Sequence, residues 1–163
     1  MTLIVLLAAI AVHELGHLAA AGLAGVNTFS GGICASGLRL SFDFSHVGYA
    51  AEALVHAGGS IAGVVTALTA SLLPWRAALS YSGISLTLAA LNLLPLSSFD
   101  GGALLSSVLS QFLMPDTAWR VCRVISALTL AVLWIAALWV ELRIGANMVL
   151  LGFVCVLLVE GMH

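Results

Sequence analysis

The sequence Val12-His13-Glu14-Leu15-Gly16-His17-Leu18 carries three ionisable side chains inside a long apolar segment. Residues four apart in a helix lie on one face, with their Cβ atoms about 6 Å apart, so His13 and His17 can bind one metal ion from the same side. Glu14 is one step round the helix and can point at a water bound to that metal. Zinc hydrolases need this set of residues, with neutral imidazoles as ligands and a carboxylate as general base.

The surrounding segment, Thr2–Gly25, is long enough to cross a bilayer, which takes about 20 helical residues. Glu14 falls near its midpoint. Ionisable side chains at that depth cost several kcal/mol when they are unpaired, and membrane proteins rarely keep them without a use. We expect this segment to be a retained span, because removal as a signal peptide would also remove both histidines.

The composition is that of a membrane protein. Of the 163 residues, 62% are hydrophobic and 7% are charged, whereas a soluble domain has about 25% charged residues. We therefore expect one polytopic domain covering residues 1–163. All of the basic residues are arginines, and they form no basic patch for nucleic acid. The cysteines Cys34, Cys122 and Cys155 are scattered, and we interpret them as small apolar residues.

The predicted fold is an all-α polytopic membrane protein of about five transmembrane helices, with a short β-hairpin after the first and a broken third helix. The predicted spans are Thr2–Gly25, Ala50–Leu73, Ala77–Leu96, Ala118–Val140 and Ile144–Glu160. Apolar and polar residues alternate strictly from Leu38 to Phe44, which predicts a strand. This hairpin could bind an extended substrate by strand addition, or it could be a surface hairpin without such a role. We expect the last two spans to be walls of the bundle or a substrate gate.

The second predicted span carries small and ionisable residues. Gly59 and Gly63 form a small-xxx-small face that suits close helix contact. Glu52 and His56 share a face near the start of the span. His56 could support the metal ligands, serve as a third ligand, or be hydrogen-bonded within the bundle.

The third predicted span ends irregularly, in Asn92-Leu93-Leu94-Pro95-Leu96-Ser97-Ser98-Phe99-Asp100-Gly101-Gly102. Pro95 lacks a backbone donor and ends or kinks the helix. Non-helical backbone at membrane depth is tolerated only inside the protein or along a wet cavity. Asp100 is therefore well placed to reach a metal held by another helix, and a short helix is predicted to follow at Ala103–Leu113.

A catalytic zinc site needs a third protein ligand beside the two histidines. A third histidine six residues after His17 is excluded, because that position is Leu23. Asp100 is favoured because it combines expected membrane depth with a helix break and flanking glycines, but the residues alone leave the choice open. The full set of candidates is Asp43, His46, Glu52, His56, Asp100, Asp116, Glu141, Glu160 and His163.

The two motifs together resemble the site-2 protease family of intramembrane zinc metalloproteases. That family pairs H-E-x-x-H on one span with N-x-x-P…D-G on a later span. The resemblance covers about residues 2–102, the expected catalytic core, and leaves residues 118–160 as accessory helices. It implies one Zn²⁺ ion with His13, His17 and Asp100 as ligands and Glu14 as base. It also implies that Asn92 acts near the substrate backbone or the oxyanion.

The short loops and the missing PDZ insertion resemble the compact branch of that family that includes the stage IV sporulation protein FB type. Ser97, Ser98 and Phe99 stand where the family often has proline-rich residues, and Ala57-Gly58-Gly59 replaces its common A-G-P. The resemblance implies a zinc metalloendopeptidase in regulated intramembrane proteolysis, with a pro-sigma factor or an anti-sigma factor as candidate substrate. Two rivals stay open: a non-catalytic membrane protein that binds zinc or substrate, and a small metal or proton transporter.

The expected partners are the lipid bilayer, a membrane-associated or transmembrane protein substrate, and regulatory membrane proteins. The expected location is a bacterial inner membrane. Arg39, Arg120 and Arg123 fall in loops on one predicted side, and Arg76 and Arg143 fall on the other. The positive-inside rule then favours an external N-terminus and a cytoplasmic hairpin.

Overall fold

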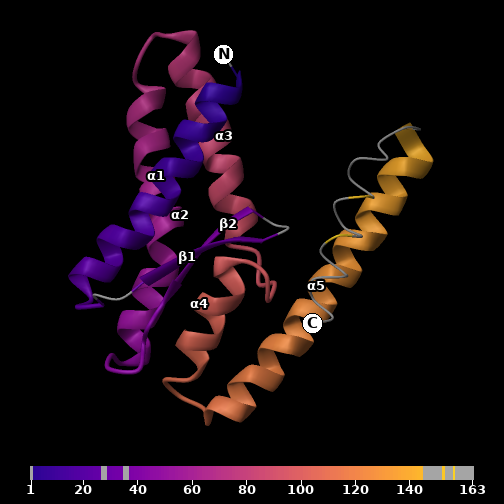
Figure 1. Ribbon diagram of the computed structural model, residues 1–163. Helices are drawn as coiled ribbons and strands as arrows, with labels where there is room; N and C mark the ends of the chain where they lie inside the picture. The colour runs from indigo at the N-terminus through magenta and orange to yellow at the C-terminus, as the bar shows by residue number, and fades with distance from the viewer. Residues whose placement is uncertain (1, 27–28, 35–36, 145–151, 153–155, 157–163) are drawn as a thin grey trace.

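The computed structural model describes residues 2–26, 29–34, 37–144, 152 and 156. Helices form most of this part of the chain, with one small antiparallel sheet (Figure 1). The elements in order are α1 (Thr2–Leu23), β1 (Phe29–Cys34), β2 (Gly37–Phe42), α2 (Tyr49–Ser71), α3 (Arg76–Asn92), α4 (Asp100–Leu109) and α5 (Pro115–Ile144).

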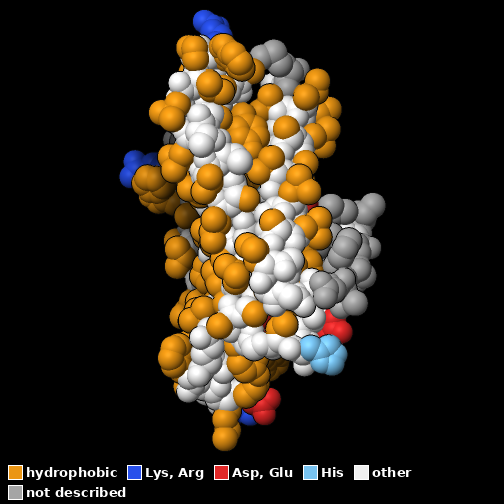
Figure 2. Space-filling view, turned by 90° about the vertical axis from the view of Figure 1, so that its left-hand side faces the viewer, with side chains coloured by type: hydrophobic (Ala, Val, Ile, Leu, Met, Phe, Trp, Pro, Cys, Tyr) orange, Lys and Arg blue, Asp and Glu red, His pale blue; other side chains and the backbone are white. Residues whose placement is uncertain are grey.

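Three of these helices, α1, α2 and α5, are long and apolar enough to cross a membrane. Hydrophobic side chains cover much of the face drawn in Figure 2, and few charged ones appear on it. The chain is therefore a helical membrane protein. The predicted total of five spans is not confirmed: α3 has 17 residues, or about 26 Å of helix, and most of Ile144–Glu160 lies outside the described residues.

Glycine contacts bring α1 and α2 close together. A Cβ atom on Gly16 would lie 2.6 Å from Ala62 Cβ, and one on Gly58 would lie 2.6 Å from Ala20 Cβ. Neither distance is sterically allowed, so only glycine permits this approach of the two helices. The small residues Gly16 and Ala20 of α1 therefore lie at this contact, which places the histidine face of α1 directly against α2.

The β-hairpin follows α1 and packs on the α1–α2 pair. Helix α1 closes at Gly25, whose φ of 76° lets the Val26 amide bond to the Ala21 carbonyl over 2.9 Å. Strands β1 and β2 then pair from Phe29↔Phe42 to Cys34↔Gly37. The predicted hairpin is confirmed, although β2 ends at Phe42 rather than at Phe44.

Aromatic side chains hold this hairpin in place. Phe42 and Phe44 pack on a buried apolar cluster contributed by α1, α2 and the turn after α1. The Phe44 ring also contacts the His56 ring, with centroids 5.3 Å apart. The end of the hairpin is therefore fixed against the same two helices that carry the histidines and their neighbours.

The third helix is broken as predicted. Helix α3 ends at Asn92, a non-helical loop follows, and α4 begins at Asp100. The start predicted at Ala103 is wrong by three residues, because an aspartate in the first turn is favourable beside the free N–H groups of a helix N-terminus. The loop predicted at 141–143 is also wrong, since α5 continues to Ile144 with Arg143 in its last turn, where a cation is favourable.

Candidate metal centre

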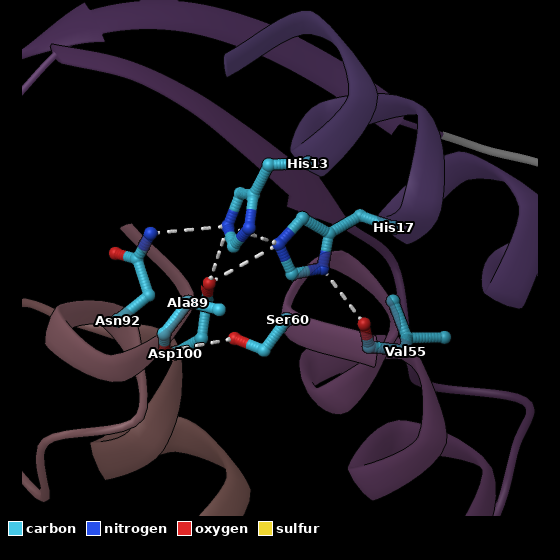
Figure 3. Close-up of polar contacts among 7 residues, drawn as sticks. All are labelled: His13, His17, Val55, Ser60, Ala89, Asn92 and Asp100. Carbon is cyan, nitrogen blue, oxygen red and sulfur yellow. Dashed lines mark hydrogen bonds and ion pairs between the residues drawn. The ribbon is translucent and has the colours of Figure 1, made fainter. Parts of the chain in front are cut away.

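His13 and His17 lie on the buried face of α1 and point to one spot between the helices (Figure 3). Their side chains are almost fully covered, at 6% and 7% exposure. The two Nε2 atoms are 3.2 Å apart. The spacing of four residues therefore places both rings on one face of α1, where they point to a common position.

Asp100 reaches that point from the start of α4. Its Oδ2 atom lies 3.0 Å from His13 Nε2 and 3.1 Å from His17 Nε2. The two glycines that follow it let α4 press against the preceding loop. A Cβ atom on Gly101 would collide with the backbone oxygens of Leu93 and Leu94. The glycines therefore allow the close turn that carries Asp100 to the histidines.

The hydrogen bonds at the centre leave three lone pairs facing one another. His17 Nδ1 donates to the Val55 carbonyl over 2.8 Å, so the Nε2 atom of a neutral His17 ring carries a lone pair. The Asn92 Nδ2 atom lies 3.2 Å from His13 Nε2, and because an amide NH₂ group is a donor, its approach fits an unprotonated Nε2. Neither nitrogen can then donate to Asp100, and protonating both rings would place two cations side by side in a buried site. A metal cation accounts for this arrangement, because it attracts all three atoms.

The distances also suit zinc. In tetrahedral coordination, ligand atoms about 2.0 Å from the ion lie about 3.3 Å from one another. The three separations here are 3.0, 3.1 and 3.2 Å. His13, His17 and Asp100 form the group of histidine and acidic side chains that could hold a metal ion among the described residues. Two imidazoles and one carboxylate match the ligand set of catalytic zinc sites, which leave a fourth position open.

Glu14 and Asn92 flank this group. Glu14 is half-buried on α1 and lies within electrostatic range of His13, His17 and Asp100. Asn92 ends α3, and its amide contacts His13. The structure thus gathers all five residues singled out from the two motifs, from α1 and from both sides of the break between α3 and α4.

None of the other candidate ligands among the described residues belongs to this group of three. His56 pairs with Glu52 at 3.8 Å, and neither belongs to the group of three. Asp43 and His46 are exposed in the loop before α2. The Ser45 amide donates to Asp43 Oδ1 over 3.0 Å and lowers the pKa of that carboxyl. The remaining candidates are Asp116 and Glu141, both on α5, and Glu160 and His163, which lie outside the described residues.

Two backbone features of α2 at the centre were not predicted. The Val55 carbonyl orients His17, and a carbonyl has no signature in the sequence. Gly59 lies directly beneath both imidazoles, where its Cβ atom would collide with His17 Nε2 and lie 2.8 Å from His13 Cε1. The glycine pair in the second span indicated close helix contact, but it did not indicate that the neighbours would be the histidine rings.

Replacing Gly59 with alanine is expected to lower zinc affinity at least about tenfold, as loss of a supporting residue typically does. The added methyl group displaces the imidazoles, although alanine favours the helix by about 1 kcal/mol. Gly63→Ala is the matched control, because its Cβ atom would meet Ser85 Oγ at an ordinary 3.4 Å. Competition against a chromophoric chelator measures both variants. Equal zinc affinities would show that Gly59 does not shape the centre.

This fold and site define a helical membrane protein in which separate helices bring two histidines and an aspartate to one point. The fold is similar to that of the solved site-2 protease from Methanocaldococcus jannaschii, with a TM-score of 0.66 and 19% sequence identity. The match covers 94% of this chain and 72% of that chain. No family model matches the sequence, and no curated protein does. The likeness therefore establishes the fold, and the chemistry has to be argued from the residues.

Proposed function

We propose that this chain is an intramembrane zinc metalloendopeptidase of the site-2 protease type. The observation that carries the proposal is the meeting of His13, His17 and Asp100 at mutual distances of 3.0–3.2 Å, with Glu14 beside them. These residues come from helices of a membrane protein whose fold is similar to that of a site-2 protease.

In this proposal His13, His17 and Asp100 hold one Zn²⁺ ion, which supplies the Lewis acidity that makes water nucleophilic near neutral pH. The Glu14 carboxylate accepts the proton of the attacking water and delivers it to the leaving amine. The Asn92 amide, 3.2 Å from His13 Nε2, is close enough to donate a hydrogen bond to the substrate backbone or to the developing oxyanion.

The proposed substrate is a membrane-associated or transmembrane protein. A helical substrate hides its carbonyls in backbone hydrogen bonds, so it has to unwind before hydrolysis. The sheet β1–β2 has two strands, and each has one edge without a strand partner among the described residues. Pairing of the unwound segment with such an edge would replace its lost hydrogen bonds.

Further parts of the proposal concern the domain organisation, the related proteases, the substrate and the membrane topology. The chain is proposed to be one domain with its catalytic core at about residues 2–102 and accessory helices at about 118–160. The compact branch that includes the stage IV sporulation protein FB type is the proposed relative, with a pro-sigma or anti-sigma factor as substrate. The proposed location is a bacterial inner membrane, with the N-terminus outside, the hairpin in the cytoplasm, and regulatory membrane proteins as further partners.

Removal of the metal tests the proposal. The purified chain in proteoliposomes is expected to contain about one zinc per chain by elemental analysis and to cleave single-pass reporter proteins whose spans carry helix-breaking residues. Treatment with 1,10-phenanthroline should abolish cleavage, and added Zn²⁺ but not Mg²⁺ should restore it, because imidazole ligands favour zinc over magnesium. Cleavage that resists the chelator would contradict the proposal, and zinc flux without cleavage would favour a transporter.

A further inference from the structure

The loop between α3 and α4 sets the position of two residues of the candidate centre. It joins Asn92, the last residue of α3, to Asp100, the first residue of α4. The first turn of α4 packs against this loop, since a Cβ atom on Gly102 would collide with the Leu96 carbonyl. This contact holds the loop on the side of α4, and the Phe99 N–H to Leu96 carbonyl bond of 3.0 Å closes it from within.

Helix α5 contacts the same loop. Leu96 of the loop and Leu130 of α5 are buried in one apolar cluster, at 2% and 8% exposure. Leu94, Phe99 and Leu133 pack on the pair. In Figure 1, α5 stands to one side of α1, α2 and α3, and its main helix neighbour within the described part of the chain is α4. Helix α5 is therefore attached to the molecule largely through the segment that carries Asp100.

A hydrogen bond makes this attachment specific. The backbone N–H of Ser97 in the loop donates to Ser126 Oγ of α5 over 3.2 Å. Ser126 is 7% exposed, so little water can replace it. Ser97 itself is exposed, and its backbone N–H, which lies outside any helix or strand, takes the covered Ser126 hydroxyl as its acceptor. Ser126 provides that acceptor from a helix that contributes no ligand to the group of three.

We infer that Ser126 is a positioning residue for the metal centre, and that α5 holds Asp100 against His13 and His17 through the loop. The inference rests on the proposed function only in naming zinc as the metal. It assigns to α5 a task beyond lining the bundle. The task is a structural one, because Ser126 acts through Ser97 and the loop and does not contact the three ligands.

Ser126→Ala tests the inference, because it leaves the Ser97 amide without its acceptor. Zinc affinity of the purified full chain is expected to fall about tenfold, the usual cost of losing a group that orients a ligand. Ser126→Thr keeps a hydroxyl and should stay within about threefold of the original affinity. The absorption spectrum of the Co²⁺-substituted protein should change in Ser126→Ala and recover in Ser126→Thr, because it reports the arrangement of the ligands.

Ser85→Ala is the matched control. Ser85 is 1% exposed on α3, and its hydroxyl donates to the Gly63 carbonyl of α2 over 3.0 Å. The variant therefore also removes a buried bond between elements, but away from the loop. It should lower the thermal stability and leave the zinc affinity and the Co²⁺ spectrum unchanged. The inference would be overturned if Ser126→Ala had the zinc affinity and the Co²⁺ spectrum of the unmodified chain. It would also be overturned if Ser85→Ala lost as much zinc affinity as Ser126→Ala.

Hydrogen exchange on the unmodified chain covers the case in which Ser126→Ala does not fold. The Ser97 amide is expected to exchange slowly, and exchange at the rate of an exposed amide would overturn the inference. None of these measurements depends on proteolysis. A negative result for Ser126 would therefore not contradict the proposed protease function. A failure of the cleavage assays would not contradict the positioning role of Ser126.

Discussion

Replacing Glu14 with glutamine is expected to reduce peptide-bond cleavage by about 10²- to 10⁴-fold, the usual contribution of a general base. Glutamine has nearly the same shape and helix propensity as glutamate, so α1 and the two histidines should keep their places. The amide nitrogen cannot accept a proton, and the proton of the attacking water then has no base. Zinc content by elemental analysis should stay at that of the unmodified chain, because the three proposed ligands are untouched.

Glu52→Gln is the matched control for this experiment. Glu52 is also a half-buried glutamate on a helix near the centre, but it pairs with His56 at 3.8 Å and not with the group of three. Its variant should retain cleavage. The comparison is made with a co-expressed membrane reporter, followed by the ratio of cut to uncut protein. Full cleavage by Glu14→Gln would remove the protease assignment, even if zinc remained bound.

The part of the site that could be predicted from sequence depends on local geometry. His13 and His17 are four residues apart in an apolar run that is long enough for a membrane helix, and helix periodicity alone places them on one face. The burial of both rings follows from Gly16, which lets α2 approach that face. A short-range pattern was therefore sufficient for the α1 side of the centre.

The part contributed by α2 and α4 depends on contacts distant in sequence. Spacing alone could not place Asp100 near His17, since 83 residues separate them, and the choice among the acidic candidates required the resemblance to a known family. The Val55 carbonyl could not be predicted, because every residue has a carbonyl and only the packing selects one. Gly59 was noticed as a small residue, but its contact with the rings depends on the crossing of α1 and α2.

The ends of elements were predicted less well, for a different reason. Glu141 and Arg143 suggested a loop after the fourth span, yet α5 continues through them to Ile144. Charged residues end an apolar pattern without ending a helix, and Arg143 lies 5.8 Å from the Trp139 ring centroid, where it can form a cation–π contact. Hydropathy therefore located the apolar part of α5 but not the length of the helix.

Replacing Asp100 with asparagine is expected to lower zinc affinity by at least about a hundredfold, more than the loss of a residue that merely supports a ligand. Asparagine keeps the shape of the side chain but removes the negative charge that faces His13 and His17. At a zinc concentration about a hundredfold above the Kd of the unmodified chain, binding stabilises the fold by about 2.7 kcal/mol. The variant should therefore lose most of a zinc-induced rise in Tm of about 5–10 °C.

Asp116→Asn gives the matched control, since Asp116, like Asp100, lies in the first turn of a helix. It should keep the full rise in Tm with zinc, because Asp116 is exposed on α5. The measurement also separates two roles for Asp100. If Asp100 were only the counter-ion of a protonated histidine, Asp100→Asn would destabilise the metal-free chain and preserve its response to zinc. A preserved zinc response in Asp100→Asn would thus remove Asp100 from the ligand set and leave two histidines, too few for a catalytic zinc site.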